Sequence, residues 1–228
     1  MGGCSFDRPR PTPLTPGLLS DAPKLLAPVA TAYGLQLDHH GMEARGVLWR
    51  NEENQRMRFE VLAGIIEAED DKGGITVNDL GCGYGAFFTF LEGRPAMTDG
   101  RYYGYDISED MVKAARQSIQ DRRATFSHSL VATHYADYSF ASGTYNLKLD
   151  NDEAAWKKYV KESLIHLWAR TQRALAFNML SIYGSERQGG LLYADPGEFF
   201  DFCIREISPN VVLFHDYSPI DWTIWLRK

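Results

Sequence analysis

Two aspartates at the ends of predicted strands are the residues best placed to do chemistry in this sequence. Asp79 lies near the end of the apolar run at residues 75–80 and is followed by Gly81, Gly83 and Gly85 at alternate positions. A strand that ends in a glycine turn and leads into a helix is typical of the nucleotide-binding corner of an open α/β sheet. Glycine lacks a Cβ atom, so the backbone N–H groups of such a turn can approach a ligand closely.

The positions of the acids indicate which kind of nucleotide fits. Asp79 would repel a pyrophosphate but suits a ligand that carries an ammonium or sulfonium group. A second predicted strand, residues 101–106, ends in Asp106, whose carboxylate can bind both hydroxyls of a ribose. The glycine spacing G-x-G-x-G also differs from the G-x-G-x-x-G of dinucleotide-binding folds. An NAD site, a glycine turn without a ligand, and a helix-capping role for Asp106 stay open as alternatives.

These two motifs, at this spacing, resemble those of the class I S-adenosylmethionine (SAM) methyltransferases. Asp-Leu-Gly-Cys-Gly-Tyr-Gly at residues 79–85 resembles the first motif of that family, and Tyr-Asp-Ile-Ser at 105–108 resembles the second. The resemblance covers the chain from about residue 51 to the C-terminus. It implies SAM as the cofactor and S-adenosylhomocysteine (SAH) as the product.

The resemblance also implies which residues bind the cofactor. Asp79 would receive the ammonium end of SAM, directly or through water, and Asp106 would bind the ribose hydroxyls. Gln55 and Arg58 share a helix face and could reach the SAM carboxylate, although a surface salt bridge is an equal alternative for the arginine. The remaining candidates are backbone or adenine contacts: Gly81, Gly83, Ile107, Met111, Ser129 and Leu130.

The methyl acceptor is expected over the carboxyl ends of the fourth and fifth strands, where open α/β sheets bind ligands. Ser142, Asn146 and Asn178 are the candidate substrate-binding residues there. The loop at residues 181–193 contains three glycines and suits a mobile lid.

Few residues can be named as catalytic, because SAM is already activated for methyl transfer. Holding donor and acceptor in position can supply about 7–11 kcal/mol, and a general base helps only where the acceptor keeps its proton. His134, His215 and Tyr145 are the candidates. For His215, a polar network with its neighbours Asp216 and Tyr217 is the favoured alternative.

Two other motifs argue for and against particular acceptors. The Asp/Asn-Pro-Pro-aromatic tetrapeptide of methyltransferases that act on nucleic-acid amines does not follow the fourth predicted strand, which disfavours methylation of DNA bases. The Asp-Asn-Asp sequence at residues 150–152 is similar to the metal ligands of catechol O-methyltransferases. It precedes a helix, however, so helix capping is the better interpretation and no metal is expected.

The elements that position these residues predict a mostly parallel seven-stranded sheet with helices on both faces and a C-terminal antiparallel hairpin. The hairpin is indicated by two strands joined at Pro219 without the long crossover that parallel neighbours need. Residues 1–50 are expected to form a tail and helical cap, with a helix at 18–33 ended by Gly34, and residues 51–228 the SAM-binding domain. The strands are predicted at residues 75–80, 101–106, 125–127, 138–142, 174–178, 211–215 and 221–226. The remaining helices are predicted to begin at residues 51, 108, 152 and 196.

Composition limits the partners that are expected. With 44% hydrophobic and 24% charged residues, the 228-residue chain is typical of a globular domain. A net charge of −6 argues against a nucleic-acid partner. Cys4, Cys82 and Cys203 lack metal-binding spacing and favour a reducing cytoplasm, and no apolar run is long enough to span a membrane. A monomer or homodimer is expected.

The predicted function is methyl transfer from SAM to an oxygen or nitrogen of a small molecule, such as a sugar or secondary metabolite. The chain is too short for a separate domain that recognises a macromolecule. A methyltransferase acting on a protein side chain or other macromolecule is the alternative, and a non-catalytic SAM-binding protein is a third possibility, because a fold alone does not certify a function.

Overall fold

The computed structural model describes residues 16–47, 51–185 and 187–228. The predicted tail before residue 16, which includes Cys4, lies outside these ranges.

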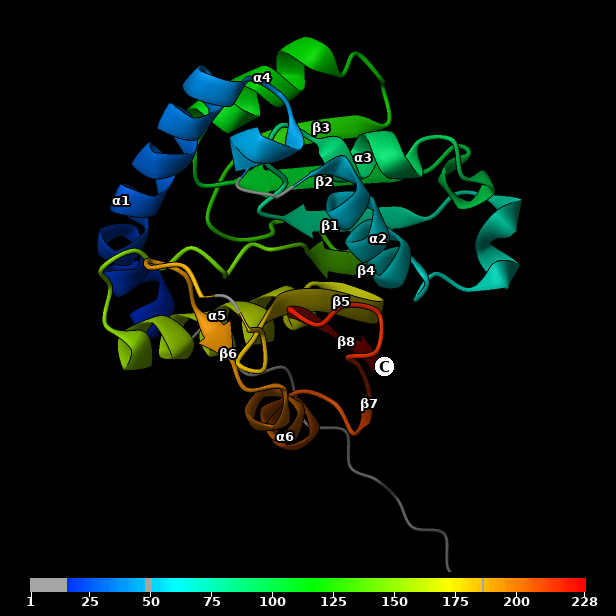
Figure 1. Cartoon of the computed structure of the whole chain (residues 1–228). Coiled ribbons are helices and arrows are strands. Elements are labelled where there is room, and N and C mark those ends of the chain that lie inside the picture. Colours follow the sequence, from blue (N-terminus) through cyan, green and yellow to red (C-terminus); the bar gives the residue numbers. More distant parts are fainter. Residues whose placement is uncertain (1–15, 48–50, 186) are drawn as a thin grey trace, which may run out of the picture.

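A twisted central sheet with helices on both faces forms the body of the protein (Figure 1). The strand order is β3-β2-β1-β4-β5-β8-β7, with the short strand β6 beside β5. The pairings among β1 to β5 are parallel, whereas β8 runs antiparallel to both β5 and β7. The strands are β1 (Thr76–Leu80), β2 (Arg101–Asp106), β3 (Ala124–His128), β4 (Ala136–Ala141), β5 (Thr171–Ser181), β6 (Tyr193–Ala194), β7 (Asn210–Phe214) and β8 (Asp221–Arg227). This confirms the predicted fold class, and β6 adds a short strand at the end of the segment predicted as a lid.

In the described ranges six α-helices cover the sheet, and three short 3₁₀ helices lie in the connections between elements. The α-helices are α1 (Pro16–His40), α2 (Glu52–Ala63), α3 (Ala86–Leu91), α4 (Glu109–Ser118), α5 (Glu153–Ala169) and α6 (Pro196–Glu206). The 3₁₀ helices are η1 (Ala44–Val47), η2 (Ala68–Lys72) and η3 (Pro95–Met97). None of the helices in the described ranges is both long and apolar enough to cross a membrane.

The predicted helix caps are present at four helix starts. Asn51, Ser108, Asp152 and Asp195 each accept a hydrogen bond from a backbone N–H in the first turn of the helix that follows. Asp152 therefore caps α5, as the capping interpretation of residues 150–152 expects.

The strand residues alternate between two hydrophobic cores. Leu175, Phe177 and Met179 of β5 belong to the core that contains α5 and α6. Ala174 and Ala176 face the opposite core, with α2 and α3. This alternation follows from the period of two in a β-strand.

The N-terminal helix differs from its prediction. Gly34 was expected to end it, but α1 continues to His40. Gly34 is buried, and a Cβ atom there would lie 3.1 Å from Oδ2 of Asp110 on α4, so this glycine allows α1 to pack closely on α4. Leu26 and Val29 of α1 are buried in the core that α5 also enters.

Candidate functional site

A cavity of about 830 Å³ lies at the carboxyl ends of β1, β2 and β4. Figure 1 shows α1 crossing this edge of the sheet. Nine of the ten predicted cofactor residues line the cavity: Gln55, Asp79, Gly81, Gly83, Asp106, Ile107, Met111, Ser129 and Leu130. The exception is Arg58.

Asp106 is held firmly at the end of β2. Its Oδ2 atom accepts a hydrogen bond from the Gly83 N–H and its Oδ1 atom from the Ser108 N–H, each at 2.8 Å. Burial raises the pKa of Asp106, and these backbone hydrogen bonds oppose that shift. Each oxygen keeps a further lone pair, so the carboxylate can still accept hydrogen bonds from two neighbouring hydroxyls.

Asp79 has a different environment at the end of β1. Its Oδ2 atom accepts a hydrogen bond from the hydroxyl of Tyr102, while Oδ1 is buried without a hydrogen-bond partner among the described residues. Burial raises the pKa of Asp79 from 3.8 to about 7; the Tyr102 hydrogen bond opposes this and the nearby Asp106 adds to it. A buried carboxylate oxygen that lacks a partner is costly unless a ligand supplies one.

The turn between β1 and α3 brings the backbone close to its neighbours. Gly81 has φ +77°, and a Cβ atom at this position would lie 2.6 Å from the Thr144 side chain. The Thr144 hydroxyl donates a hydrogen bond to the Leu80 carbonyl at 2.6 Å, so it cannot easily turn away. Cys82, in the same turn, is buried, and burial raises the pKa of its thiol, which fits a packing role.

Helix α1 contributes two further residues to the cavity, Leu26 and Tyr33. Leu26 and Tyr159 of α5, which also lines the cavity, were not predicted at the site. Both appear in the sequence only as apolar positions of helices, a pattern that any core residue shares.

A second cavity, of about 1210 Å³, adjoins the first. Tyr33, Val47 and Gly143 line both cavities. Asn146 lines the second cavity, together with residues of the 181–193 segment that was predicted as a lid.

The other two predicted substrate residues, Ser142 and Asn178, do not line the second cavity. Ser142 lines the first cavity. Asn178 lines neither, and its Oδ1 atom accepts a hydrogen bond from the Gly143 N–H at 2.7 Å. Asn178 therefore supports the backbone where the two cavities meet.

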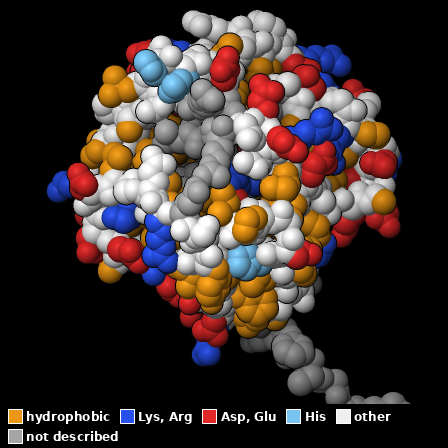
Figure 2. Space-filling model, in the orientation of Figure 1, with side chains coloured by type: hydrophobic (Ala, Val, Ile, Leu, Met, Phe, Trp, Pro, Cys, Tyr) orange, Lys and Arg blue, Asp and Glu red, His pale blue; other side chains and the backbone are white. Residues whose placement is uncertain are grey.

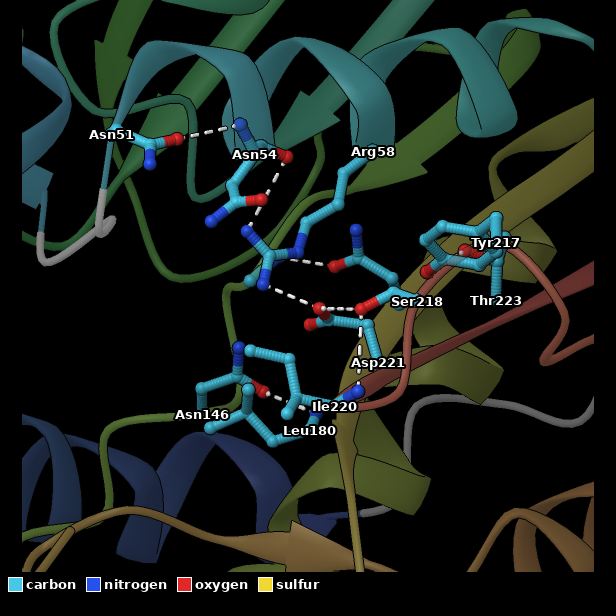
Figure 3. Close-up of polar contacts among 12 residues, drawn as sticks. Asn51, Asn54, Arg58, Asn146, Leu180, Tyr217, Ser218, Ile220, Asp221 and Thr223 are labelled. Atoms are coloured by element: carbon cyan, nitrogen blue, oxygen red, sulfur yellow. Dashed lines mark hydrogen bonds and ion pairs between the residues drawn. The ribbon is translucent and has the colours of Figure 1, made fainter. Parts of the chain in front are cut away.

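Arg58 lines the second cavity rather than the first. Figure 3 shows its side chain reaching from α2 to Asp221 at the start of β8. The Nη2 atom lies 2.5 Å from Oδ2 of Asp221, which also accepts a hydrogen bond from Ser218 Oγ at 2.9 Å. Both partners of the ion pair are buried, so this is not the surface salt bridge considered from the sequence.

None of the three predicted catalytic residues lines either cavity. His134 lies just before β4, where its ring stacks on Tyr103 at 4.0 Å and its Nδ1 atom lies 2.9 Å from the hydroxyl of Tyr105, a residue that does line the first cavity. Tyr145 is buried in the core with its hydroxyl 3.0 Å from Ser163 Oγ, and burial raises its pKa. His215 follows β7, the last strand of the sheet and two strands beyond β5.

The described residues include no group of three or more His, Cys, Asp or Glu side chains arranged to hold a metal ion.

Comparison with known proteins identifies relatives of this chain. The family described as "Methyltransferase domain" matches residues 77–175. The Mycobacterium tuberculosis protein named "Putative methyltransferase Rv1506c" is 39% identical over 167 residues, which cover 72% of this chain and 98% of that protein.

Solved structures share the fold at low sequence identity. Magnesium protoporphyrin IX methyltransferase from Synechocystis PCC 6803 with bound SAH superposes with a TM-score of 0.57 at 16% identity, over 77% of this chain and 83% of that one. Human N-acetylserotonin methyltransferase in complex with SAM gives a TM-score of 0.61 at 13% identity, over 91% of this chain and 59% of that one.

Three observations lead to one conclusion. They are the strand order with its antiparallel end, the glycine turn flanked by two acids, and 39% sequence identity over 98% of a named methyltransferase. The chain belongs to the class I SAM-dependent methyltransferases.

Proposed function

We propose that the chain binds SAM in the first cavity and methylates an oxygen or nitrogen of a small molecule bound in the second. The observation that carries this proposal is that the two cavities meet, at Tyr33, Val47 and Gly143. A methyl donor and its acceptor need such a junction, since transfer requires in-line contact between them.

The lining of the first cavity fits SAM. The buried Oδ1 atom of Asp79, without a hydrogen-bond partner in the described residues, suits the cofactor's ammonium group. Asp106, fixed by two backbone N–H groups, suits the ribose hydroxyls, and Ile107 and Met111 suit the adenine. The cofactor supplies an electrophilic methyl group, and the residues of this chain orient it and exclude water. We further propose that α1 serves as a cap over this cavity.

Two observations favour a small acceptor over a macromolecule. The second cavity lies between the 181–193 segment, the loop after β4 and the residues before β8, and is lined by side chains of all three. On the face shown in Figure 2, acidic and basic side chains are interspersed among the coloured residues rather than gathered into a basic surface for a polyanion.

The cofactor assignment is tested by replacing Asp106 with alanine. Loss of the ribose contacts, which are hydrogen bonds to a charged group, should weaken SAH binding by about 10- to 100-fold in calorimetry. Glu109→Ala, at an exposed position on the first turn of α4, is the control and should leave SAH affinity unchanged. Circular dichroism checks that both variants fold. Unchanged SAH affinity in the Asp106 variant would contradict the assignment.

The class of acceptor is tested with methyl-labelled SAM. The purified protein is incubated separately with a metabolite fraction, a protein fraction and an RNA fraction of cell extracts. Label is expected in the metabolite fraction. Label only in protein or RNA would overturn the proposal of a small acceptor, and SAH binding without transfer to any fraction would favour the non-catalytic alternative.

A further inference from the structure

Tyr33 lies where the two cavities meet and comes from the N-terminal helix. Among the described residues only Val47 and Gly143 also line both cavities. The Tyr33 side chain packs against the core that contains α5 and α6. The next residue, Gly34, brings α1 close to Asp110 of α4, so the helix is held in place beside Tyr33.

The hydroxyl of Tyr33 differs from those of the other tyrosines that line the two cavities. Four of these each form a hydrogen bond with a described residue: Tyr84 with Gln55, Tyr105 with His134, Tyr159 with Ser163, and Tyr193 with Gln188. The Tyr33 hydroxyl forms none with any residue in the described ranges. A hydroxyl that the protein leaves without a hydrogen bond is available to a ligand.

The Tyr33 hydroxyl stays protonated at neutral pH. Burial raises the pKa of this hydroxyl well above its usual value, and the negative charge of Asp106 adds to the shift. A protonated phenol donates a hydrogen bond, but it cannot remove a proton from a ligand. The influence of Asp106 also indicates that Tyr33 lies near the proposed ribose site.

The proposed binding of SAM places its methyl group at the same junction. The sulfonium of SAM joins the ribose to the amino-acid chain, and the proposed sites for these two parts are Asp106 and Asp79. The methyl group therefore lies between the two sites, and the acceptor must approach it from the second cavity. Tyr33 lines both the cavity of the donor and the cavity of the acceptor.

An acceptor atom that binds the Tyr33 hydroxyl needs two lone pairs, one for the hydrogen bond and one for the methyl group. An oxygen has both, whereas an amine nitrogen has a single lone pair. The hydrogen bond is strongest when the oxygen is ionised. An ionised oxygen also has no proton to lose, so it does not need a base, a role that protonated Tyr33 cannot fill.

We propose that the methyl acceptor is an ionised oxygen, of a phenolate or a carboxylate, that accepts a hydrogen bond from the Tyr33 hydroxyl. An oxygen lone pair forms the new C–O bond, the C–S bond breaks, and its electron pair stays on sulfur to give SAH. No proton moves, and Tyr33 keeps its own. This inference rests on the proposed function and narrows it from oxygen or nitrogen to oxygen. Leu147, Leu180 and Ile220 of the second cavity suit an aromatic or hydrocarbon body of the acceptor.

The test uses small probes that differ in the atom offered to Tyr33. Para-nitrophenol in its ionised form and benzoate are titrated by calorimetry into the full chain saturated with SAH. Para-nitroaniline, with an amine in place of the phenol oxygen, is titrated in parallel. At least one of the two anions should bind about tenfold more tightly than para-nitroaniline, and the tighter anion distinguishes a phenolate from a carboxylate acceptor.

A variant connects this preference to Tyr33. Tyr33→Phe removes the hydroxyl and keeps the ring, so the preference for anions should fall about tenfold while SAH still binds. The absorption band of bound para-nitrophenolate should also move to longer wavelength in this variant, because its oxygen has lost a hydrogen-bond donor. Tyr135→Phe, at a position that is 61% exposed and lines neither cavity, is the matched control and should behave as the parent does.

The outcomes separate this inference from the proposed function. If SAH fails to bind the unaltered chain, the proposed function itself fails. If SAH binds but neither anion is preferred to para-nitroaniline, or if the preference survives in Tyr33→Phe, the inference is overturned and the cofactor site stands. Transfer of labelled methyl groups to nitrogen in the metabolite fraction would also overturn it. Loss of SAH affinity in Tyr33→Phe with an unchanged preference for anions would assign the hydroxyl to the ribose instead.

Discussion

Asp79 and Asp106 end neighbouring parallel strands at the same cavity, yet only one of them is fully engaged by the protein. Both oxygens of Asp106 accept backbone hydrogen bonds, whereas one oxygen of Asp79 has no partner among the described residues. Placing two buried acids side by side is unfavourable in the protein alone, because burial and mutual repulsion both oppose ionisation. A cationic ligand reduces both effects. The two acids therefore destabilise the protein without its ligand, and the same acids strengthen the binding of a cation.

This arrangement predicts how stability depends on pH. The pKa of Asp79 is raised from 3.8 to about 7, so between these values the folded chain holds a proton that the unfolded chain has released. The stabilisation from that proton is complete below about pH 4 and is lost as the pH rises through 7. Asp79→Asn cannot ionise, so the variant should gain stability over the parent as the pH rises from 5 to 8, measured by urea unfolding.

The control for this prediction has the opposite sign. Arg123 lowers the pKa of Asp121 to about 2, so ionised Asp121 stabilises the folded chain at neutral pH. Asp121→Asn should therefore lose stability relative to the parent at pH 8. If Asp79→Asn also lost stability relative to the parent at pH 8, ionised Asp79 would not destabilise the folded chain.

Gly81 leads to a second prediction at single residues. Alanine would adopt a left-handed backbone there and place its Cβ atom 2.6 Å from the hydrogen-bonded Thr144, which should cost about 2 kcal/mol or more in the free energy of unfolding. At Gly93 a Cβ atom would meet nothing within 4 Å, so Gly93→Ala should change stability by less than about 1 kcal/mol. Urea unfolding of the two variants compares them directly, and equal losses would show that the turn can relax.

Nine of the ten residues predicted to bind the cofactor line the first cavity, because strand ends and glycine spacing determine their positions. The same reasoning does not place the three catalytic candidates at either cavity. His134 is a polar residue between two strands, and the sequence does not show that its ring stacks on Tyr103 and contacts the Tyr105 hydroxyl. Arg58 was correctly paired with Gln55 on one helix face, but the sequence gives no sign that Asp221, 163 residues away, holds it beside the second cavity.

At the scale of elements, the strands were easier to predict than the N-terminal helix. A strand was predicted within every observed strand except β6, whose two residues are too few to form a pattern. Helix α1 contains Pro23 and Pro28 and passes through Gly34, all of which argue locally for a break. Packing on α4 and α5 overrides these preferences, and no local pattern contains that information.

Helix α1 is predicted to stabilise the domain and shape the cofactor cavity together. Leu26 is 5% exposed and lines the cavity, so Leu26→Ala should lower the free energy of unfolding by about 2–4 kcal/mol and weaken SAH binding. Leu35, on the same helix but 64% exposed, is the matched control, and its replacement by alanine should cost less than about 0.5 kcal/mol. Equal stability of the two variants would mean that α1 is only loosely attached.

At the scale of the whole molecule, a buried ion pair and a hydrogen bond join α2 to the C-terminal hairpin. Arg58 on α2 and Asp221 on β8 are 4% and 1% exposed, and Trp225 of β8 also donates a hydrogen bond to the Val61 carbonyl of α2 at 3.0 Å. The parts of the chain on either side of the parallel strands thus meet at one edge of the second cavity. Stability and acceptor binding are expected to be coupled at this point.

The last prediction concerns this coupling. Asp221→Asn leaves the Arg58 charge buried without its counter-charge and should lower the free energy of unfolding by about 3 kcal/mol. Replacing both partners with apolar residues, Arg58→Met with Asp221→Leu, should recover most of that loss, since no unpaired charge remains. The exposed pair of Asp201 and Arg205 serves as the control, and Asp201→Asn should cost less than about 1 kcal/mol. Urea unfolding measures all three. A double variant as unstable as Asp221→Asn would indicate that the fold depends on these two side chains in a way other than through their charges.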